Sequence, residues 1–325
     1  MKLLVTGGAG YVGSHFVWDA VTAGHQVTVI DHLERGHREM VHPDAKLVVG
    51  DIRDRALLDA VIADVRPDTV LHYAAYALVG ESVEKPNLYD DNNVGGTRSL
   101  LEAMGLAKSH ANFIFSSSCA VFGAPTKMPI AEDDPKQPLN PYGETKLRCE
   151  TLIKDFAARY GFAAVNLRYF NACGAHTSAP IGEAHDPETH LIPNILKAVK
   201  VGGQVTIHGA DFPTRDGTCI RDYIHVMDLA RAHLLAAEWL KDQPRGSCEA
   251  IHLGTGEGHS NLEVLRAAEA ITKQTVPYRI GPRRAGDPPE LVADPRRSKA
   301  FLHFEPTHSS LETIVHSAWR WHSRH

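Results

Sequence analysis

A glycine-rich segment directly after the first apolar run constrains the fold of this chain most. Residues 6–13 read Thr-Gly-Gly-Ala-Gly-Tyr-Val-Gly; they follow a strand-like run at 2–6 and open a helical pattern from Tyr11 to Ala23. The glycines satisfy two related spacings, G-x-G-x-x-G with Gly8, Gly10 and Gly13, and G-x-x-G-x-x-G with Gly7, Gly10 and Gly13. Because glycine has no side chain, such a turn can be tight and a pyrophosphate can approach the positive helix N-terminus. The pattern predicts a strand–turn–helix unit that binds a dinucleotide.

An acidic residue follows at the distance that this fingerprint requires, about 20 residues further on. Asp31 ends the strand-like run Gln26 to Ile30. A carboxylate there can accept hydrogen bonds from ribose hydroxyls and repels a 2′-phosphate, which favours NAD over NADP. Arg35 is close enough in sequence to leave NADP open as the alternative.

Short apolar runs alternate with helical patterns through the first half of the chain. The runs lie at 3–6, 26–30, 47–49, 69–71, 113–115 and 163–167. This alternation is typical of strand–helix–strand units around a parallel sheet covered on both faces. After Asn171, glycine and proline become frequent, as in a loop-rich lobe that carries a substrate site. We therefore predict an α/β fold: a Rossmann-type doubly wound parallel sheet in a dinucleotide-binding domain at 1–170, with later segments returning to it near 205–235, and a smaller, loop-rich α/β substrate lobe at 171–325.

Charge and cysteine content narrow the class of partner. The 325 residues carry 34 Lys and Arg against 39 Asp and Glu, a net charge of -5, which argues against nucleic acid and anionic membranes and favours a small molecule. The five cysteines are odd in number and contain no Cys-x-x-Cys, so we expect reduced thiols. No charged-then-apolar leader and no long apolar run is present. We expect a soluble, cytoplasmic protein.

Histidine is abundant but does not follow a familiar metal-binding pattern. The chain has 20 histidines and no His-Glu-x-x-His. His185 and His190 are separated by Asp-Pro-Glu-Thr, and the proline prevents the regular helical spacing of a ligand pair. We predict no metal site.

A tyrosine and a lysine four residues apart supply the candidate chemistry. Tyr142 and Lys146 lie in the run Pro-Tyr-Gly-Glu-Thr-Lys at 141–146. On a helix they share one face, with Cβ atoms about 5 to 6 Å apart. A phenol with a pKa near 10 is a poor base at neutral pH, and a nearby cation lowers that pKa. Alone this spacing is common by chance; its meaning depends on the nucleotide-binding loop.

With the glycine loop, the Tyr-Lys pair and Phe-Ser-Ser-Ser at 115–118 in view, the chain resembles the extended short-chain dehydrogenase/reductase superfamily and, within it, the UDP-glucose 4-epimerases, also called UDP-galactose 4-epimerases. The likeness runs nearly end to end. It rests on ordered blocks at 79–83 (Val-Gly-Glu-Ser-Val), 91–97 (Asp-Asn-Asn-Val-Gly-Gly-Thr), 167–171 (Leu-Arg-Tyr-Phe-Asn), 221–229 (Arg-Asp-Tyr-Ile-His-Val-Met-Asp-Leu) and 283–287 (Arg-Arg-Ala-Gly-Asp).

The resemblance implies residue roles. Tyr142 takes the proton of the sugar 4-hydroxyl, Ser118 hydrogen-bonds that oxygen, and Lys146 binds the nicotinamide ribose and lowers the phenol pKa. The implied NAD-binding residues are Gly7, Gly10, Tyr11, Val12, Gly13, Asp31, Asp51, Ile52, Tyr73, Ala74, Asn92, Ser116, Tyr142, Lys146 and Tyr169. The implied contacts to a UDP-sugar are Ser118, Asn171, His190, Leu191, Arg221, Tyr223, Arg284, Asp287 and Leu291. Two arginines suit a pyrophosphate, because guanidinium forks match phosphate oxygens.

The implied reaction is reversible epimerisation at C4 of UDP-glucose and UDP-galactose through a 4-keto sugar, with tightly bound NAD. Related dehydratases and decarboxylases carry an acid after the Ser/Thr, whereas Cys119 follows Ser118 here. UDP-pentoses and UDP-N-acetylhexosamines remain alternative substrates, the latter because Leu291 stands where the family often has tyrosine; His190 also departs from the family, which has asparagine. A protein that senses NAD without catalysis is the remote alternative.

The resemblance also implies a homodimer that pairs two helices per subunit. The candidates are Asn93 to Ala107 and Pro141 to Tyr160. Their apolar residues Leu100, Leu101, Leu147 and Leu152 could equally face the subunit's own core.

Overall fold

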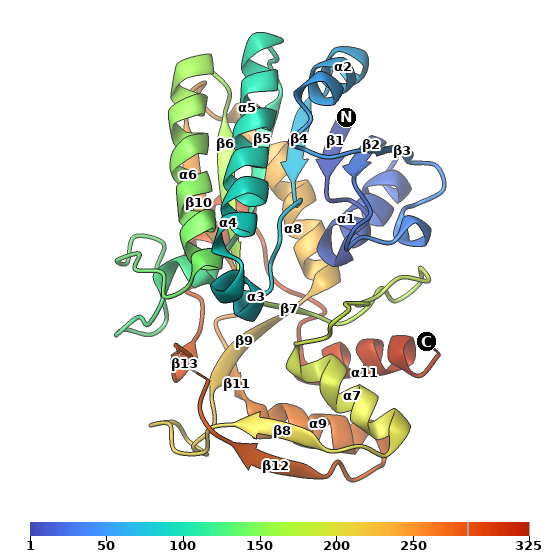
Figure 1. The fold of residues 1–325 in the computed structure, drawn as a ribbon, viewed down its shortest axis with the longest axis vertical. Coiled ribbons are helices and arrows are strands. Elements are labelled where there is room, and N and C mark those ends of the chain that lie inside the picture. Colours follow the sequence, from blue (N-terminus) through green and yellow to red (C-terminus); the bar gives the residue numbers. More distant parts are fainter. Residues whose placement is uncertain (285, 325) are drawn as a thin grey trace.

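A seven-stranded parallel sheet organises the larger of two lobes (Figure 1). The computed structural model describes residues 1–284 and 286–324. The strand order is β10-β6-β5-β4-β1-β2-β3. The strands are β1 (Lys2–Thr6), β2 (Gln26–Asp31), β3 (Lys46–Val49), β4 (Thr69–His72), β5 (Asn112–Ser118), β6 (Ala164–Tyr169) and β10 (Cys248–Leu253). The order reverses beside β1, the first strand, so the sheet is doubly wound as predicted.

Helices cover both faces of this sheet. One face carries α1 (Tyr11–Thr22) and α8 (Val226–Trp239), and the other carries α2 (Arg55–Val65), α5 (Gly96–Leu106) and α6 (Pro141–Tyr160). Successive strand residues point to opposite faces: Leu3 and Val5 pack with α1 and α8, whereas Leu4 packs with the other set. Two-sided burial explains why the strands are apolar runs rather than alternating ones.

Shorter elements connect this framework. They are α3 (Val79–Glu84), α4 (Pro86–Tyr89), a π-helical turn (Asp90–Gly95), α10 (Arg296–Leu302), and 3-10 turns at Arg38–Met40, Cys119–Phe122 and Leu240–Asp242. The predicted helix at 93–107 thus begins as the π-helical turn and becomes α5 at Gly96.

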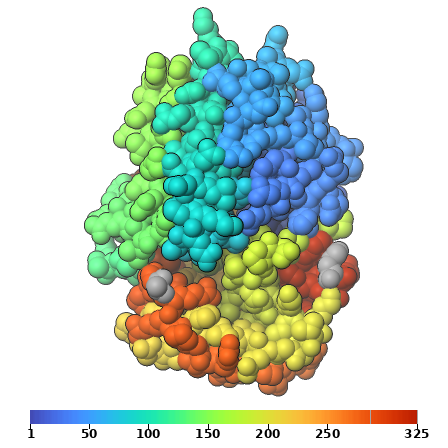
Figure 2. Space-filling model, in the orientation of Figure 1, coloured from blue at the N-terminus to red at the C-terminus, as the bar shows by residue number. Residues whose placement is uncertain are grey.

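The smaller lobe is built from two small sheets backed by three helices. A four-stranded sheet contains β7 (Asn171–Cys173), β9 (Ile220–His225), β11 (Gly258–Ser260) and β13 (Glu290–Leu291), and β8 (Val205–His208) pairs with β12 (Tyr278–Gly281). The helices α7 (Leu191–Val201), α9 (Asn261–Thr272) and α11 (Leu311–His322) share one apolar core. In the space-filling view the larger lobe rests on this smaller one (Figure 2).

The chain returns to the larger lobe after an excursion through the smaller one. The sequence predicts a return near 205–235; that range includes β8 and β9, which pair within the smaller lobe, and the first part of α8. The returning elements are α8, which packs against α1, and β10, which pairs with β6. Among the described residues, no helix combines the length and apolar composition that crossing a membrane requires.

A buried ion pair joins α6 to β6, the strand next to the edge strand β10. Arg168 Nε and Nη2 donate to the Glu150 carboxylate at 2.8 and 2.7 Å, and the Ser117 hydroxyl donates to the same carboxylate at 2.6 Å. The side chains are only 3% and 7% exposed. Removing one partner would leave the other charge buried and unpaired.

We predict that Arg168→Ala lowers the free energy of unfolding by about 3 to 5 kcal/mol, because the Glu150 carboxylate loses its counter-charge. Lys46→Ala is the matched control, since the Lys46–Asp64 pair is exposed and should contribute little. Urea denaturation followed by circular dichroism measures both. Equal losses in the two variants would contradict a special role for the buried pair.

Candidate active site

The glycine loop forms a turn that side chains would obstruct. Gly7 has a φ of +75°, and a Cβ there would lie 2.5 Å from the Ala74 nitrogen. A Cβ on Gly13 would lie 2.2 Å from the Gly7 carbonyl oxygen. Gly10 precedes α1, and no side chain in the described part of the chain caps that helix. The first N–H groups of α1 are therefore available to an anion, as a pyrophosphate site requires.

A cleft runs from this loop along the carboxyl ends of β1, β2 and β4. Eight predicted cofactor residues line it: Gly7, Gly10, Asp31, Asp51, Ile52, Tyr73, Ala74 and Asn92. Lining residues that the sequence did not predict include His32, Gly36, Gly50, Ala75 and Tyr76. Gly50 directly follows β3, and Gly36 follows shortly after Glu34. These positions could have suggested a place in the cleft, but glycine alone is a weak signal.

The Asp31 carboxylate is held in place by the backbone. It accepts hydrogen bonds from the Ala9 and Leu33 nitrogens at 3.0 and 2.9 Å and is almost completely buried. Arg35, which left NADP open, turns to Glu81 and donates to both carboxylate oxygens at 2.9 Å. A fixed carboxylate beside a neutralised guanidinium favours a ribose hydroxyl over a 2′-phosphate.

Four other predicted cofactor residues, Tyr11, Val12, Ser116 and Tyr169, are not among the residues that line the cleft. The Tyr11 hydroxyl donates to the Gly174 carbonyl at 2.6 Å, and Val12 packs into the core beneath α1. Tyr169 is hydrogen-bonded to His233 at 2.6 Å, and the Ser116 carbonyl accepts from Lys146 at 2.7 Å. These four lie on α1, β5 and β6, and their contact with the cofactor stays a prediction.

Helix α6 starts where its sequence specifies and brings Tyr142 to Ser118. Pro141 occupies the first turn, where its missing N–H costs nothing, and the Asn140 side chain accepts from the Gly143 nitrogen at 2.9 Å. A Cβ on Gly143 would lie 2.6 Å from the Ala120 carbonyl oxygen, so α6 lies directly against the turn that follows β5. In this arrangement the Ser118 hydroxyl, which accepts from the Ala120 nitrogen at 3.1 Å, is near enough to Tyr142 to affect its pKa.

The electrostatics of the pair differ from the prediction. Burial raises the pKa of Tyr142 to about 12, and the Ser118 hydrogen bond opposes this shift. Burial likewise lowers the pKa of Lys146 to about 8. The Lys146 ammonium lies 5.8 Å from the centre of the Tyr142 ring. In the chain alone loss of hydration dominates, so the phenol pKa lies above its ordinary value, and the lowering by Lys146 stays a prediction.

The strands of the smaller lobe place the predicted sugar contacts side by side. In the sheet register Asn171 is opposite Tyr223, and Leu291 is opposite Arg221. Arg221 reaches Asp287 at 3.5 Å. Burial raises the pKa of Tyr223, and the Arg221 and Arg284 guanidiniums act against that rise. Leu291 packs in the apolar cluster that contains Cys119 and thus borders the turn after Ser118.

Two predicted contacts lie at the start of α7. Leu191 is the first residue of that helix and packs against its apolar core. His190 directs its Nδ1 at Glu183 and Glu188, at 2.7 and 3.1 Å, rather than standing free as a ligand contact. The sequence did not predict this carboxylate environment.

Known proteins with the same features identify the family. The model of the NAD dependent epimerase/dehydratase family matches residues 3–253. The chain belongs to this family.

Individual relatives match over the full length. A UDP-glucose 4-epimerase of Lactobacillus helveticus is 47% identical over 326 residues, covering 100% of this chain and 98% of its own. The crystal structure of UDP-glucose 4-epimerase from Brucella ovis in complex with NAD has a TM-score of 0.94 at 46% identity, covering 99% of this chain and 98% of that one. A Stenotrophomonas maltophila UDP-glucose-4-epimerase with bound NAD and formylated UDP-arabinopyranose has a TM-score of 0.93 at 40% identity, covering 99% and 98%. The predicted family is confirmed.

We predict that Gly13→Ala weakens NAD binding at least tenfold, as judged by titration with NADH fluorescence, because the new methyl displaces the Gly7 carbonyl and the turn with it. Gly80→Ala is the matched control: its Cβ meets nothing within 4 Å. If both variants bind NADH like the parent chain, the loop is not the pyrophosphate site.

Proposed function

We propose that this epimerase-family chain interconverts UDP-glucose and UDP-galactose by inverting C4. The observation that carries the proposal is the meeting of Ser118 and Tyr142, with Lys146 behind them, at the carboxyl end of β5. The glycine loop follows the carboxyl end of β1 in the same parallel sheet, so the reacting groups and the dinucleotide cleft share one edge. Full-length similarity to UDP-glucose 4-epimerases supports the same reaction.

The residues present fit NAD. The glycine positions leave room that a Cβ would fill, the start of α1 is uncapped, and Asp31 offers a fixed carboxylate for the ribose. We assign the larger lobe to NAD and the smaller lobe to the UDP-sugar. When bound, NAD takes up the C4 hydride and later gives it back, so the reaction has no net redox change.

The chain's own groups handle the proton. Tyr142 accepts the proton of the sugar 4-hydroxyl as that carbon is oxidised, and Ser118 hydrogen-bonds the same oxygen. Because burial keeps the phenol neutral, the positive charges of Lys146 and the oxidised nicotinamide must together favour the phenolate. The 4-keto sugar then turns while Arg221 and Arg284 hold the UDP, and Tyr142 returns the proton on the opposite face.

The residue after Ser118 favours epimerisation over dehydration. Burial raises the pKa of the Cys119 thiol to about 12, so it remains neutral near pH 7. A neutral thiol in an apolar cluster is a poor acid and a poor base, whereas a dehydration step needs a group that moves a second proton.

We predict that Tyr142→Phe lowers kcat for UDP-galactose by about 10²- to 10⁴-fold while NAD binding is retained, because only the proton acceptor is lost. Turnover is measured by coupling UDP-glucose formation to a dehydrogenase, and NADH titration checks the cofactor site. Unchanged turnover would remove Tyr142 from the mechanism. If the parent chain, with its cofactor site filled, forms no UDP-glucose, the proposed function itself fails.

The wall at Leu291 governs the sugar range. Its side chain is shorter than the tyrosine common in the family, which leaves room for an N-acetyl group; a pentose also fits this wall. We predict that Leu291→Tyr lowers turnover of UDP-N-acetylgalactosamine at least tenfold relative to UDP-galactose, because the aromatic ring occupies that space. A panel of UDP-galactose, UDP-N-acetylgalactosamine and a UDP-pentose measures it. An unchanged ratio would place the N-acetyl group elsewhere.

We also propose a cytoplasmic homodimer that pairs α5 and α6. Leu100 and Leu101 are fully buried in the subunit's own core, so they cannot form the interface. Leu147 and Leu152 on α6 are half-buried; each packs in part against an apolar cluster of its own subunit and is in part exposed. Sedimentation equilibrium of the purified chain tests the dimer.

A further inference from the structure

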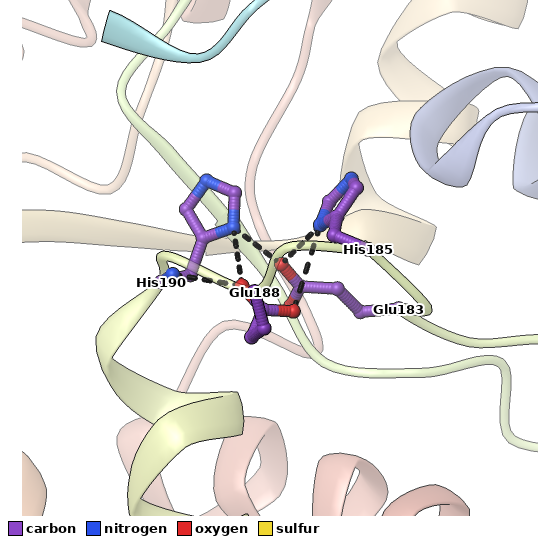
Figure 3. A group of neighbouring side chains, drawn as sticks. All are labelled: Glu183, His185, Glu188 and His190. Atoms are coloured by element: carbon purple, nitrogen blue, oxygen red, sulfur yellow. Dashed lines mark hydrogen bonds and ion pairs between the residues drawn. The ribbon is translucent and has the colours of Figure 1, made fainter. Parts of the chain in front are cut away.

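Four charged or ionisable side chains converge in the loop that leads into α7 (Figure 3). They are Glu183, His185, Glu188 and His190, spaced Glu-x-His-x-x-Glu-x-His. In the close-up both imidazole rings turn a nitrogen toward the two carboxylates between them. Each residue offers one atom to a common centre, and these four atoms lie within 4.8 Å of one another.

The spacing of these atoms is that of a small coordination shell. His185 Nδ1 lies 3.1 Å from Glu183 Oε1 and 3.7 Å from Glu188 Oε2. His190 Nδ1 lies 2.7 and 3.1 Å from the same two carboxylates. A tetrahedral ion with bonds of about 2.0 to 2.1 Å needs ligand atoms about 3.3 Å apart. The observed distances bracket that value, so small side-chain shifts would complete the shell.

The surroundings hold the carboxylates in place. The Glu183 side chain is only 4% exposed, and that of Glu188 is 11% exposed. Glu188 Oε1 also accepts from the backbone nitrogens of Thr189 and His190, at 2.8 and 2.7 Å. Two carboxylates this deeply buried require two positive charges close by. A divalent cation supplies both at once.

We propose that these four side chains form a binding site for Zn²⁺. Two imidazoles with two carboxylates suit zinc, whereas Mg²⁺ and Ca²⁺ prefer oxygen ligands alone. Four protein ligands leave no open position, so the site is structural and separate from the chemistry at Tyr142. The sequence predicts no metal because Pro187 breaks the helical spacing of the histidines; an irregular loop brings them together without a helix.

The loop contacts both lobes, which gives the ion a role. The Ala184 carbonyl accepts from His37 of the larger lobe at 2.9 Å, and the Glu183 carbonyl accepts from Trp321 of α11 at 2.9 Å. The His185 ring packs edge-on against Tyr11, at the start of α1, with the ring centres 5.8 Å apart. Bound zinc would hold the entry to α7, where the UDP-sugar contacts begin, against the cofactor loop.

The competing account is a closed cluster of ion pairs with both imidazoles protonated. Burial lowers the pKa of His190, but the Glu183 and Glu188 carboxylates raise it by more. The net result is a pKa of about 10. Burial and the same carboxylates act likewise on His185. Two imidazole protons and one zinc ion therefore supply the same positive charge to the two carboxylates. A direct measurement of metal binding distinguishes the two accounts.

The test uses tag-free, chelator-treated full-length chain, with no UDP-sugar added, so its outcome does not depend on the proposed function. Gel filtration with added ZnCl₂, followed by elemental analysis, should give one Zn²⁺ per chain. Thermal denaturation should show a Tm raised by about 5 °C when free Zn²⁺ exceeds the Kd about 100-fold. Co²⁺ in place of Zn²⁺ should give the visible absorption of a tetrahedral site.

Three variants assign the site. His185→Ala should lose the stoichiometric Zn²⁺ and the Tm shift. Glu188→Gln keeps an oxygen for the backbone hydrogen bonds but removes the anionic ligand; it should weaken binding at least tenfold, and it serves if His185→Ala does not fold. His316→Ala removes an exposed histidine of α11 and should bind like the parent chain.

Two results would overturn the proposal. A folded parent chain that retains no Zn²⁺ and shows no Tm shift contains only the ion-pair cluster. Zn²⁺ retention that is the same in the parent chain, His185→Ala and Glu188→Gln reflects adventitious binding at other histidines.

Discussion

Seven parallel strands present their carboxyl ends at one edge, and the rest of the molecule depends on this constraint. Because both faces of the sheet are buried under helices, the larger lobe can hold a ligand at that edge and in the loops that follow it. The glycine loop follows β1, Asp31 ends β2, Tyr73 follows β4, and Ser118 ends β5. Gly7, Asp31 and Tyr73, from elements far apart in the sequence, thus line one cleft, and Ser118 lies at the same edge of the sheet.

Exclusion of water is the second constraint on the site, and it disfavours the charged forms of Tyr142 and Lys146. Burial raises the pKa of Tyr142 and lowers that of Lys146, so the chain alone stabilises the neutral form of each. A site built this way responds strongly to an added positive charge, because charges interact more strongly where water is excluded. In the proposed mechanism the Tyr142 phenol would therefore stay neutral until the positive charge of oxidised NAD lies beside it.

Those parts of the fold and of the site that local chemistry determines could be predicted from the sequence. Helix α6 occupies 141–160 as expected, because Pro141 and Asn140 specify its start. The six apolar runs of the first half became strands. Strand β10 was not predicted: its first half, Cys-Glu-Ala, is only half-buried and comes after a long excursion through the smaller lobe. The pKa of Tyr142 could not be predicted, because it depends on burial that no spacing reveals. His185 and His190 come together in a loop, and a loop has no periodic pattern from which their proximity could be predicted.

The central claim is that C4 is inverted by removing and returning the same hydride, and isotopic labelling tests it most directly. UDP-galactose carrying deuterium at C4 would be converted to UDP-glucose in ordinary water, and the product analysed by NMR. The account predicts that the deuterium stays at C4, because the hydride never leaves the protein. Loss of the deuterium to water would contradict it, since that outcome requires C4 to be deprotonated rather than oxidised.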